Sequence, residues 1–157
     1  MIKIICLGKL KEKYLCDAVN EYKKRISKYS KIEIIELNDL DDLNKEKELI
    51  EKNIGSKDYV ITLEIEGNSI SSVELANKID NIFNTNSTIT FIIGSSTGLH
   101  QDIKNRSNYK LSFSKLTFPH QLFRVILLEQ IYRSFKINNN ETYHKWKTFM
   151  IFCIKKI

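Results

Sequence analysis

The residues best suited to binding a small molecule follow two predicted strands in the second half of the chain. The apolar run 89–93 ends in the loop 94–98 (GSSTG), and the run 109–113 ends in the stretch 112–118 (SFSKLTF). Loops at the carboxyl ends of parallel strands meet at one edge of an open α/β sheet, where small cofactors bind. The sequence therefore predicts one pocket here, with walls made mostly of backbone groups.

The loop 94–98 leaves the content of this pocket open. It resembles a phosphate-binding loop, but it lacks the Walker lysine and the G-x-G-x-x-G spacing. A nucleoside triphosphate or a dinucleotide is therefore disfavoured. A plain tight turn and a loop that contacts a cofactor both fit the pattern. The stretch 112–118 could be an ordinary connection, but its hydroxyls and aromatics indicate that its backbone meets a ligand.

The histidines and cysteines indicate no metal site and no acyl-transfer site. His100, His120 and His144 are isolated from carboxylates and cysteines at metal-ligand spacing, so no metal is expected. No Ser-His-Asp or Cys-His arrangement is evident. Cys6 is expected to pack as a small apolar residue in a strand. An odd set of three dispersed cysteines favours a reducing, cytoplasmic compartment.

Apolar runs and helical spacing alternate along the chain and predict an α/β fold with a mostly parallel sheet flanked by helices. Ser71 and Glu74 match a capping box at a helix start. The last helix is apolar over more than one stripe, so it is expected to pack on more than its own sheet. The charged segment 38–53 is expected to be helical or partly mobile. We predict strands at 2–7, 32–37, 59–65, 89–93 and 109–113, and helices at 12–29, 71–83 and 120–137, with a short helix before the last strand.

Length and charge suggest one domain with a polyanionic partner. The chain has 157 residues, no apolar run long enough to span a bilayer, and no signal-peptide pattern at its start. The net charge is +6, and the positive charge is concentrated in residues 100–157, which hold 11 Lys and Arg against three carboxylates. A basic half favours nucleic acid as a partner, whereas the alternative is a solvated lysine-rich surface.

Several segments, taken together, resemble one family over nearly the whole chain to Lys145. They are IKIICLGKLKEKY, VITLEIEG, FIIGSSTGLH, RSNYKLSFSKLTFPHQLFRVILLEQIYRSFKI and the closing YHK. They resemble the RlmH family of SPOUT-class methyltransferases, which methylate N3 of a pseudouridine in 23S ribosomal RNA of the large ribosomal subunit.

The resemblance implies a SPOUT α/β knot, with a deep trefoil knot on the carboxyl-terminal side. It also implies a cytoplasmic homodimer that acts on the ribosome and uses S-adenosylmethionine as methyl donor, without a metal or a membrane. Carried over by position, the cofactor contacts of the family fall on Leu63, Gly94, Phe113, Ser114, Lys115, Leu116, Thr117 and Phe118.

The resemblance places the catalytic groups near the end of the chain. Tyr143, His144 and Lys145 match the closing motif of the family, whereas spacing alone predicts that the polar tail after Asn138 is disordered. Methylation of an imide N3 requires loss of its proton, so His144 is expected to act as a base or an orienting group. Lys145 and Arg133 are expected to contact phosphate or base.

The chain departs from the family pattern at two places. Ser95 stands where the family usually has a second glycine, and we expect this small side chain to be tolerated. Residues 146–157 form an apolar-rich extension beyond the expected single domain of residues 1–145. Two rival functions follow, namely a knotted methyltransferase that acts on transfer RNA, and a non-catalytic RNA-binding knot protein impaired by the extension.

Overall fold

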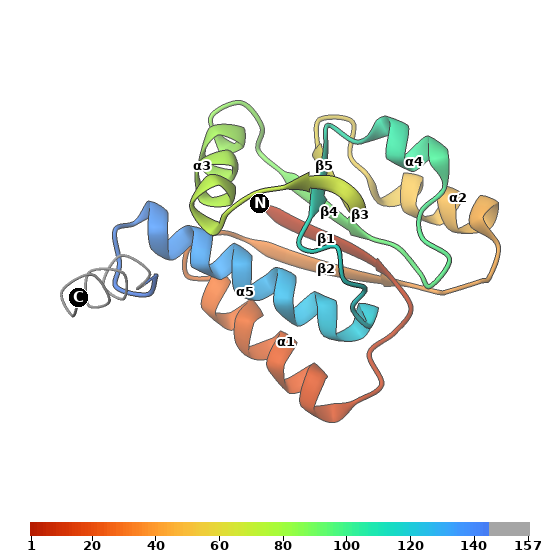
Figure 1. Ribbon diagram of the computed structural model, residues 1–157, viewed down its shortest axis with the longest axis horizontal. Coiled ribbons are helices and arrows are strands. Elements are labelled where there is room, and N and C mark those ends of the chain that lie inside the picture. The colour runs from red at the N-terminus through yellow and green to blue at the C-terminus, as the bar shows by residue number, and fades with distance from the viewer. Residues whose placement is uncertain (145–157) are drawn as a thin grey trace, which may run out of the picture.

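The protein is a three-layer α/β structure in which helices cover both faces of one five-stranded sheet (Figure 1). The computed structural model describes residues 1–144. The strand order is β2-β1-β4-β3-β5, and all four neighbouring pairs are parallel. The strands are β1 (Ile2–Leu7), β2 (Ile32–Leu37), β3 (Tyr59–Ser69), β4 (Ile89–Ile93) and β5 (Tyr109–Ser112). The helices are α1 (Lys13–Ile26), α2 (Leu43–Asn53), α3 (Ser72–Phe83), α4 (Gln101–Arg106) and α5 (His120–Asn138).

The continuous apolar runs form strands because both faces of the sheet are buried. In β1, Ile2, Ile4 and Cys6 face the larger core with α1, α3 and α5, whereas Ile5 and Leu7 face the smaller core. The smaller core is closed by α2 and α4, which lie on the opposite face of the sheet. The predicted α/β fold with a parallel sheet is therefore confirmed.

Three local predictions are confirmed. Ser71 caps α3 by accepting a hydrogen bond from the Glu74 backbone, and the Glu74 carboxylate accepts one from the Ser71 backbone. The charged segment 38–53 contains a regular helix, α2. Cys6 is fully buried in the larger core, and its burial raises the pKa of the thiol to about 11. This thiol is therefore protonated at neutral pH and serves as packing.

Two local predictions are wrong. Strand β3 continues to Ser69 instead of ending at residue 65, because its last residues pair again with β5. The tail after α5 is not disordered over the described residues. Glu141 accepts hydrogen bonds from Tyr29 and Lys136, and Tyr143 packs edge-on against Tyr132 with ring centroids 5.0 Å apart. Long-range partners of this kind leave no signal in local spacing.

Two predictions about the carboxyl-terminal part are not tested. Threading of the chain into a trefoil knot stays a prediction, as does the division into a domain of residues 1–145 and an extension of residues 146–157. Lys145 and the extension lie outside the described residues.

Candidate functional site

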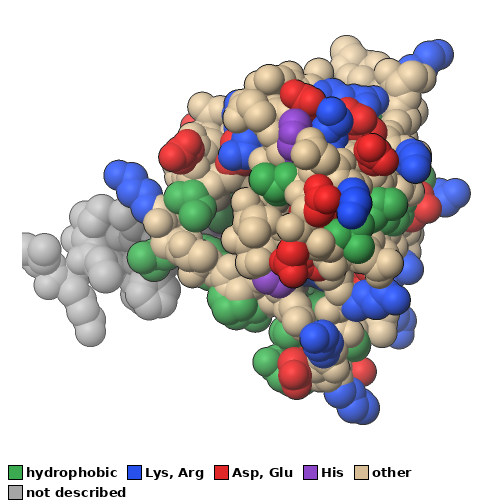
Figure 2. Space-filling view, turned by 90° about the vertical axis from the view of Figure 1, so that its right-hand side faces the viewer, with side chains coloured by type: hydrophobic (Ala, Val, Ile, Leu, Met, Phe, Trp, Pro, Cys, Tyr) green, Lys and Arg blue, Asp and Glu red, His purple; other side chains and the backbone are tan. Residues whose placement is uncertain are grey.

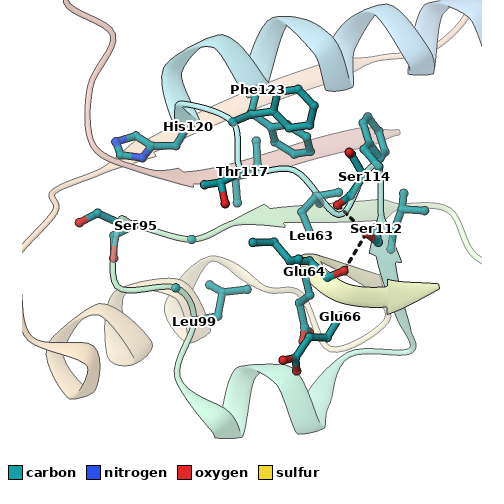
Figure 3. Close-up of a pocket in the computed structure, with 18 of the residues that line it drawn as sticks. Leu63, Glu64, Glu66, Ser95, Leu99, Ser112, Ser114, Thr117, His120 and Phe123 are labelled. Atoms are coloured by element: carbon teal, nitrogen blue, oxygen red, sulfur yellow. Dashed lines mark hydrogen bonds between the residues drawn. The ribbon is translucent and has the colours of Figure 1, made fainter. Parts of the chain in front are cut away.

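A cavity of about 790 Å³ opens at the carboxyl ends of β3, β4 and β5 (Figure 3). Its walls come from the end of β3, the loop after β4, helix α4, and the segment between β5 and α5. Such a volume lies in the usual range for sites of small molecules and cofactors. The predicted meeting of the two loops at one pocket is therefore confirmed.

Most residues proposed as cofactor contacts line this cavity. They are Leu63, Gly94, Phe113, Ser114, Leu116, Thr117 and Phe118. Lys115 belongs to the same segment but does not line the cavity. Four further residues line the cavity although the sequence did not predict them there, namely the charged residues Glu64, Glu66 and Lys104, and His120. The two glutamates in the stretch VITLEIEG are the sequence signal that could have pointed to Glu64 and Glu66.

Gly94 is required at its position because two loop segments cross there. A Cβ atom added to Gly94 would lie 2.6 Å from the carbonyl oxygen of Gly98, closer than nonbonded atoms approach. Ser95 and Gly98 form an isolated antiparallel bridge that closes the loop. The loop is therefore a tight turn that also forms a wall of the cavity, and its contact with a cofactor stays a prediction.

Ser95, which departs from the family pattern, ties this loop to helix α2. Its hydroxyl donates to the carboxylate of Glu46 across 3.2 Å and lies 2.9 Å from the hydroxyl of Thr97. Glu46 is itself buried, and its other oxygen accepts from the Leu40 backbone. A buried carboxylate needs such donors because desolvation without them is costly. The serine thus supplies a contact with α2 that a glycine could not make.

The segment 113–118 is held by hydroxyl groups and aromatic rings. The Ser112 hydroxyl lies within hydrogen-bond distance of the carbonyls of Ile65 and Ser114, at 2.9 and 3.2 Å (Figure 3). The ring of Phe123 packs against Phe113 and Phe118, with centroids 5.1 and 5.9 Å apart. These contacts fix the segment at both ends, which leaves its middle facing the cavity.

Arg124 fastens the first turn of α5 to the sheet. Its guanidinium donates to Glu36 Oε1 at 2.6 Å and to the backbone carbonyls of Leu7 and Gly8. The side chain is only 2% exposed. Because it joins the ends of β1 and β2 to the helix that follows the cavity segment, Arg124 fixes the position at which that segment ends.

The predicted catalytic residues that the structure describes form a second cluster near the end of α5. Arg133 donates to the Glu129 carboxylate across 2.6 Å and stacks over the ring of Tyr143 at 4.8 Å. The Tyr143 hydroxyl donates to the same carboxylate across 3.2 Å. Burial and then the neighbouring Tyr22 and Glu129 raise the pKa of Tyr143 to about 12. Its phenol is therefore a hydrogen-bond donor at neutral pH, not a base.

His144 joins this cluster through Arg133. Its Nδ1 atom lies 3.3 Å from Nη1 of Arg133. A guanidinium can only donate, so Nδ1 accepts, and a neutral ring then carries its proton on Nε2. In this arrangement Nε2 of His144 is a donor. This geometry favours the orienting role over the role of base, for which Nδ1 would have to leave Arg133.

Arg133, Tyr143 and His144 form what we call the predicted catalytic cluster. The cavity and this cluster lie at opposite ends of α5. His120 and Phe123 line the cavity, whereas Arg133 is 13 positions after His120 on the helix. At 1.5 Å per residue the axial separation is about 20 Å. The structure of one chain therefore does not bring the predicted cofactor residues together with Arg133, Tyr143 and His144.

Over the described residues, the face of the molecule shown in Figure 2 does not carry one uniform basic field. Basic and acidic side chains are interspersed on the face shown in Figure 2. Several cations of the basic half are also matched by carboxylates, since Arg124 pairs with Glu36, Arg133 with Glu129 and Lys136 with Glu141. Within residues 1–144, no helix is long and apolar enough to cross a membrane, and no three His, Cys, Asp or Glu side chains gather as a metal site.

Comparisons with known proteins point to one family. The family model described as "Predicted SPOUT methyltransferase" matches residues 1–144. A protein of Methanococcus maripaludis named "Putative ribosomal RNA large subunit methyltransferase H" is 55% identical, over 92% of this chain and 99% of that protein. The ribosomal RNA large subunit methyltransferase H of Clostridium botulinum strain Hall is 52% identical over the same shares.

A solved structure has a related fold. It is described as a probable methylase family protein from Haemophilus influenzae Rd KW20, and it aligns with a TM-score of 0.57. The alignment covers 92% of this chain and 70% of that chain, at 12% sequence identity. At this identity the likeness concerns the fold alone.

Proposed function

This chain belongs to the SPOUT methyltransferase family and, within it, to the ribosomal RNA large subunit methyltransferase H family, and on this premise we propose that it methylates N3 of a pseudouridine in 23S ribosomal RNA. The methyl donor is S-adenosylmethionine, and the substrate is the large ribosomal subunit in the cytoplasm. The observation that carries the proposal is the cavity at the carboxyl ends of β3, β4 and β5, at the positions where the family binds its cofactor.

The residues of the cavity fit this donor. Leu63, Leu116 and the aromatic residues of the segment 113–118 offer apolar walls for an adenine ring, and the backbone of the same segment offers polar groups for its edge. A sulfonium donor requires no metal. The cofactor supplies an electrophilic methyl group, and the protein has mainly to place that group in line with a nucleophile.

The residues of the catalytic cluster fit the acceptor. Transfer forms the bond between N3 and the methyl carbon, breaks the bond between sulfur and that carbon to leave S-adenosylhomocysteine, and releases the N3 proton to water. The Nε2–H group of His144 is a donor that can orient a carbonyl of the target base. We propose that Arg133 holds His144 in this orientation, rather than contacting phosphate, because its guanidinium already pairs with Glu129. Lys145 remains proposed as a phosphate or base contact.

A homodimer would bring the two halves of the site together. The outward face of α5 carries Leu122, Ile126 and Arg133, and Leu122 is 41% exposed although it is apolar. A two-fold axis near the middle of α5 would pair this face with the same face of a second chain, in antiparallel orientation. The cluster of one chain would then lie near the cavity of the other. This arrangement also agrees with the apolar character of α5 on more than one side.

Methylation of purified substrates tests the function directly. We expect transfer of labelled methyl from S-adenosylmethionine to assembled ribosomes lacking the modification, with mass mapping placing it on a pseudouridine. Transfer to transfer RNA, and not to ribosomes or ribosomal RNA, would favour the first rival function. Absence of saturable S-adenosylmethionine binding in a calorimetric titration would favour the non-catalytic RNA-binding protein.

Replacement of Gly94 tests the cavity. We expect Gly94→Ala to weaken S-adenosylmethionine binding at least about 10-fold, because the new Cβ must push away the Gly98 carbonyl and reshape the loop. Calorimetric titration measures the change, and circular dichroism checks that the variant is folded. Unchanged affinity in a folded variant would contradict the assignment of this loop as a cofactor wall.

Replacement of His144 tests the catalytic cluster. We expect His144→Ala to lower turnover on ribosomes about 100-fold, in the usual range for a positioned donor or base, with cofactor affinity unchanged. Single-turnover rates with saturating cofactor are the measurement. If turnover is unchanged, His144 neither orients the base nor accepts its proton.

A further inference from the structure

The end of β3 has an irregular pairing that turns two acidic residues toward the cavity. Leu111 of β5 pairs first with Leu63 and then again with Asn68, so residues 64–67 form an excursion from the ladder. Gly67 allows it, since a Cβ atom there would lie 2.8 Å from the backbone of Leu111. Bulges of this kind re-aim side chains next to active sites. Here the excursion begins with Glu64, which lines the cavity (Figure 3).

Glu64 is held in place but keeps a free acceptor. The hydroxyl of the buried Thr62 donates to its Oε1 across 2.7 Å, and the carboxylate side chain is only 10% exposed. Its Oε2 lies 3.9 Å from Nζ of Lys104, which is too long for a hydrogen bond. Among the described residues, neither Oε2 nor Nζ of Lys104 has a hydrogen-bond partner. Both groups therefore keep the capacity to bind a ligand.

Glu64 and Lys104 present opposite charges on a cavity wall that is otherwise mainly apolar or hydroxyl-bearing. A carboxylate and an ammonium about 4 Å apart are complementary to the ammonium and carboxylate of an α-amino acid, because each ligand charge meets its opposite. S-Adenosylmethionine carries such a group at the end opposite its adenine. The apolar segment 113–118 suits the adenine, which leaves the charged pair for the other end.

We propose that Glu64 and Lys104 bind the aminoacyl end of the cofactor, with Glu64 accepting from the α-ammonium group and Lys104 donating to the α-carboxylate group. This inference rests on the proposed function and adds two residues to its cofactor site. It assigns a purpose to the excursion of β3 and to helix α4, neither of which takes part in the reaction otherwise.

Binding of three related ligands tests the inference. S-Adenosylmethionine and S-adenosylhomocysteine carry the aminoacyl end, whereas 5′-methylthioadenosine has the adenosine and the sulfur without it. We expect Glu64→Gln and Lys104→Met each to weaken binding of the first two ligands about 10-fold and to leave 5′-methylthioadenosine binding unchanged. Glu33→Gln and Lys57→Met, at exposed positions away from the cavity, are matched controls and should change none of the affinities.

Each other outcome has a distinct meaning. An equal loss for all three ligands would overturn the inference, because the pair would then only support the shape of the cavity. A loss confined to S-adenosylmethionine would also overturn it, since Glu64 would then respond to the sulfonium charge. Failure of the unaltered protein to bind any of the three would instead overturn the proposed cofactor. Lys104 lies on a partly exposed helix, so Lys104→Met still tests the inference if Glu64→Gln is unstable.

Discussion

Mixing two impaired variants is expected to restore methyltransferase activity. Gly94→Ala damages the cavity, and Arg133→Ala removes the guanidinium that holds His144 while leaving the cavity intact. The two sites lie about 20 Å apart along α5 in one chain. If each active site uses the cavity of one chain and the cluster of its partner, a mixed dimer contains one site with neither change.

The expected yield follows from random pairing. Half of the dimers in an equal mixture are mixed and each has one intact site of two, so the mixture should show about a quarter of the unaltered activity. At a fixed, low cofactor concentration, turnover should be reduced about 100-fold by Arg133→Ala alone and at least about 10-fold by Gly94→Ala alone. The measurement is methyl transfer to ribosomes after the chains are mixed in denaturant and refolded together.

The control for this experiment is a chain carrying both changes, mixed with either single variant. Neither of these mixtures can form an intact site by pairing between chains, so neither should recover. Activity that stays at the level of the single variants in the Gly94→Ala and Arg133→Ala mixture, despite dimer formation by light scattering, would contradict a site shared between chains.

Replacement of Arg124 is expected to cause the largest loss of stability. Arg124→Ala leaves the Glu36 carboxylate without its cation and the carbonyls of Leu7 and Gly8 without their donor. The loss of three hydrogen bonds made by a charged group, together with the cavity left by a fully buried side chain, costs about 3 kcal/mol in the free energy of unfolding. Urea unfolding measures the change, and the midpoint should fall with little change in slope.

A matched control separates burial from charge. Arg106→Ala removes an arginine from the exposed end of α4, and it should change the free energy of unfolding by less than about 0.5 kcal/mol. Equal effects of the two replacements would show that the hydrogen bonds of Arg124 do not hold α5 to the sheet. Glu36→Gln keeps an acceptor for Arg124, so its loss in the free energy of unfolding should lie between those of Arg106→Ala and Arg124→Ala.

Much of the fold was predictable because its signals are local. Strands 2–7, 32–37 and 89–93 are confirmed with their bounds, since an apolar run between polar turns depends only on neighbouring residues. The capping box at Ser71 is confirmed for the same reason. The end of β3 was misplaced because its second pairing with β5 depends on residues more than 40 positions away.

The candidate site was predictable in part. The glycine loop and the segment 112–118 lie together as expected, because parallel strands place their carboxyl ends at one edge of the sheet. The acidic residues of the cavity were missed, since their turn toward it results from the irregular pairing of β3. The contact between Ser95 and Glu46 was also missed, because the two residues are 49 positions apart and share no motif.

The sequence by itself thus determined the α/β class, the parallel sheet, the two loops that meet at the cavity and, through resemblance, the family. Only the tertiary structure decided which charges are matched by partners, and that the cavity and the catalytic cluster lie at opposite ends of α5. The physical reason is that periodicity and turn chemistry act between near neighbours. The partners of buried charged side chains, such as Glu36 for Arg124 and Ser95 for Glu46, depend on distances that exist only after the chain has folded.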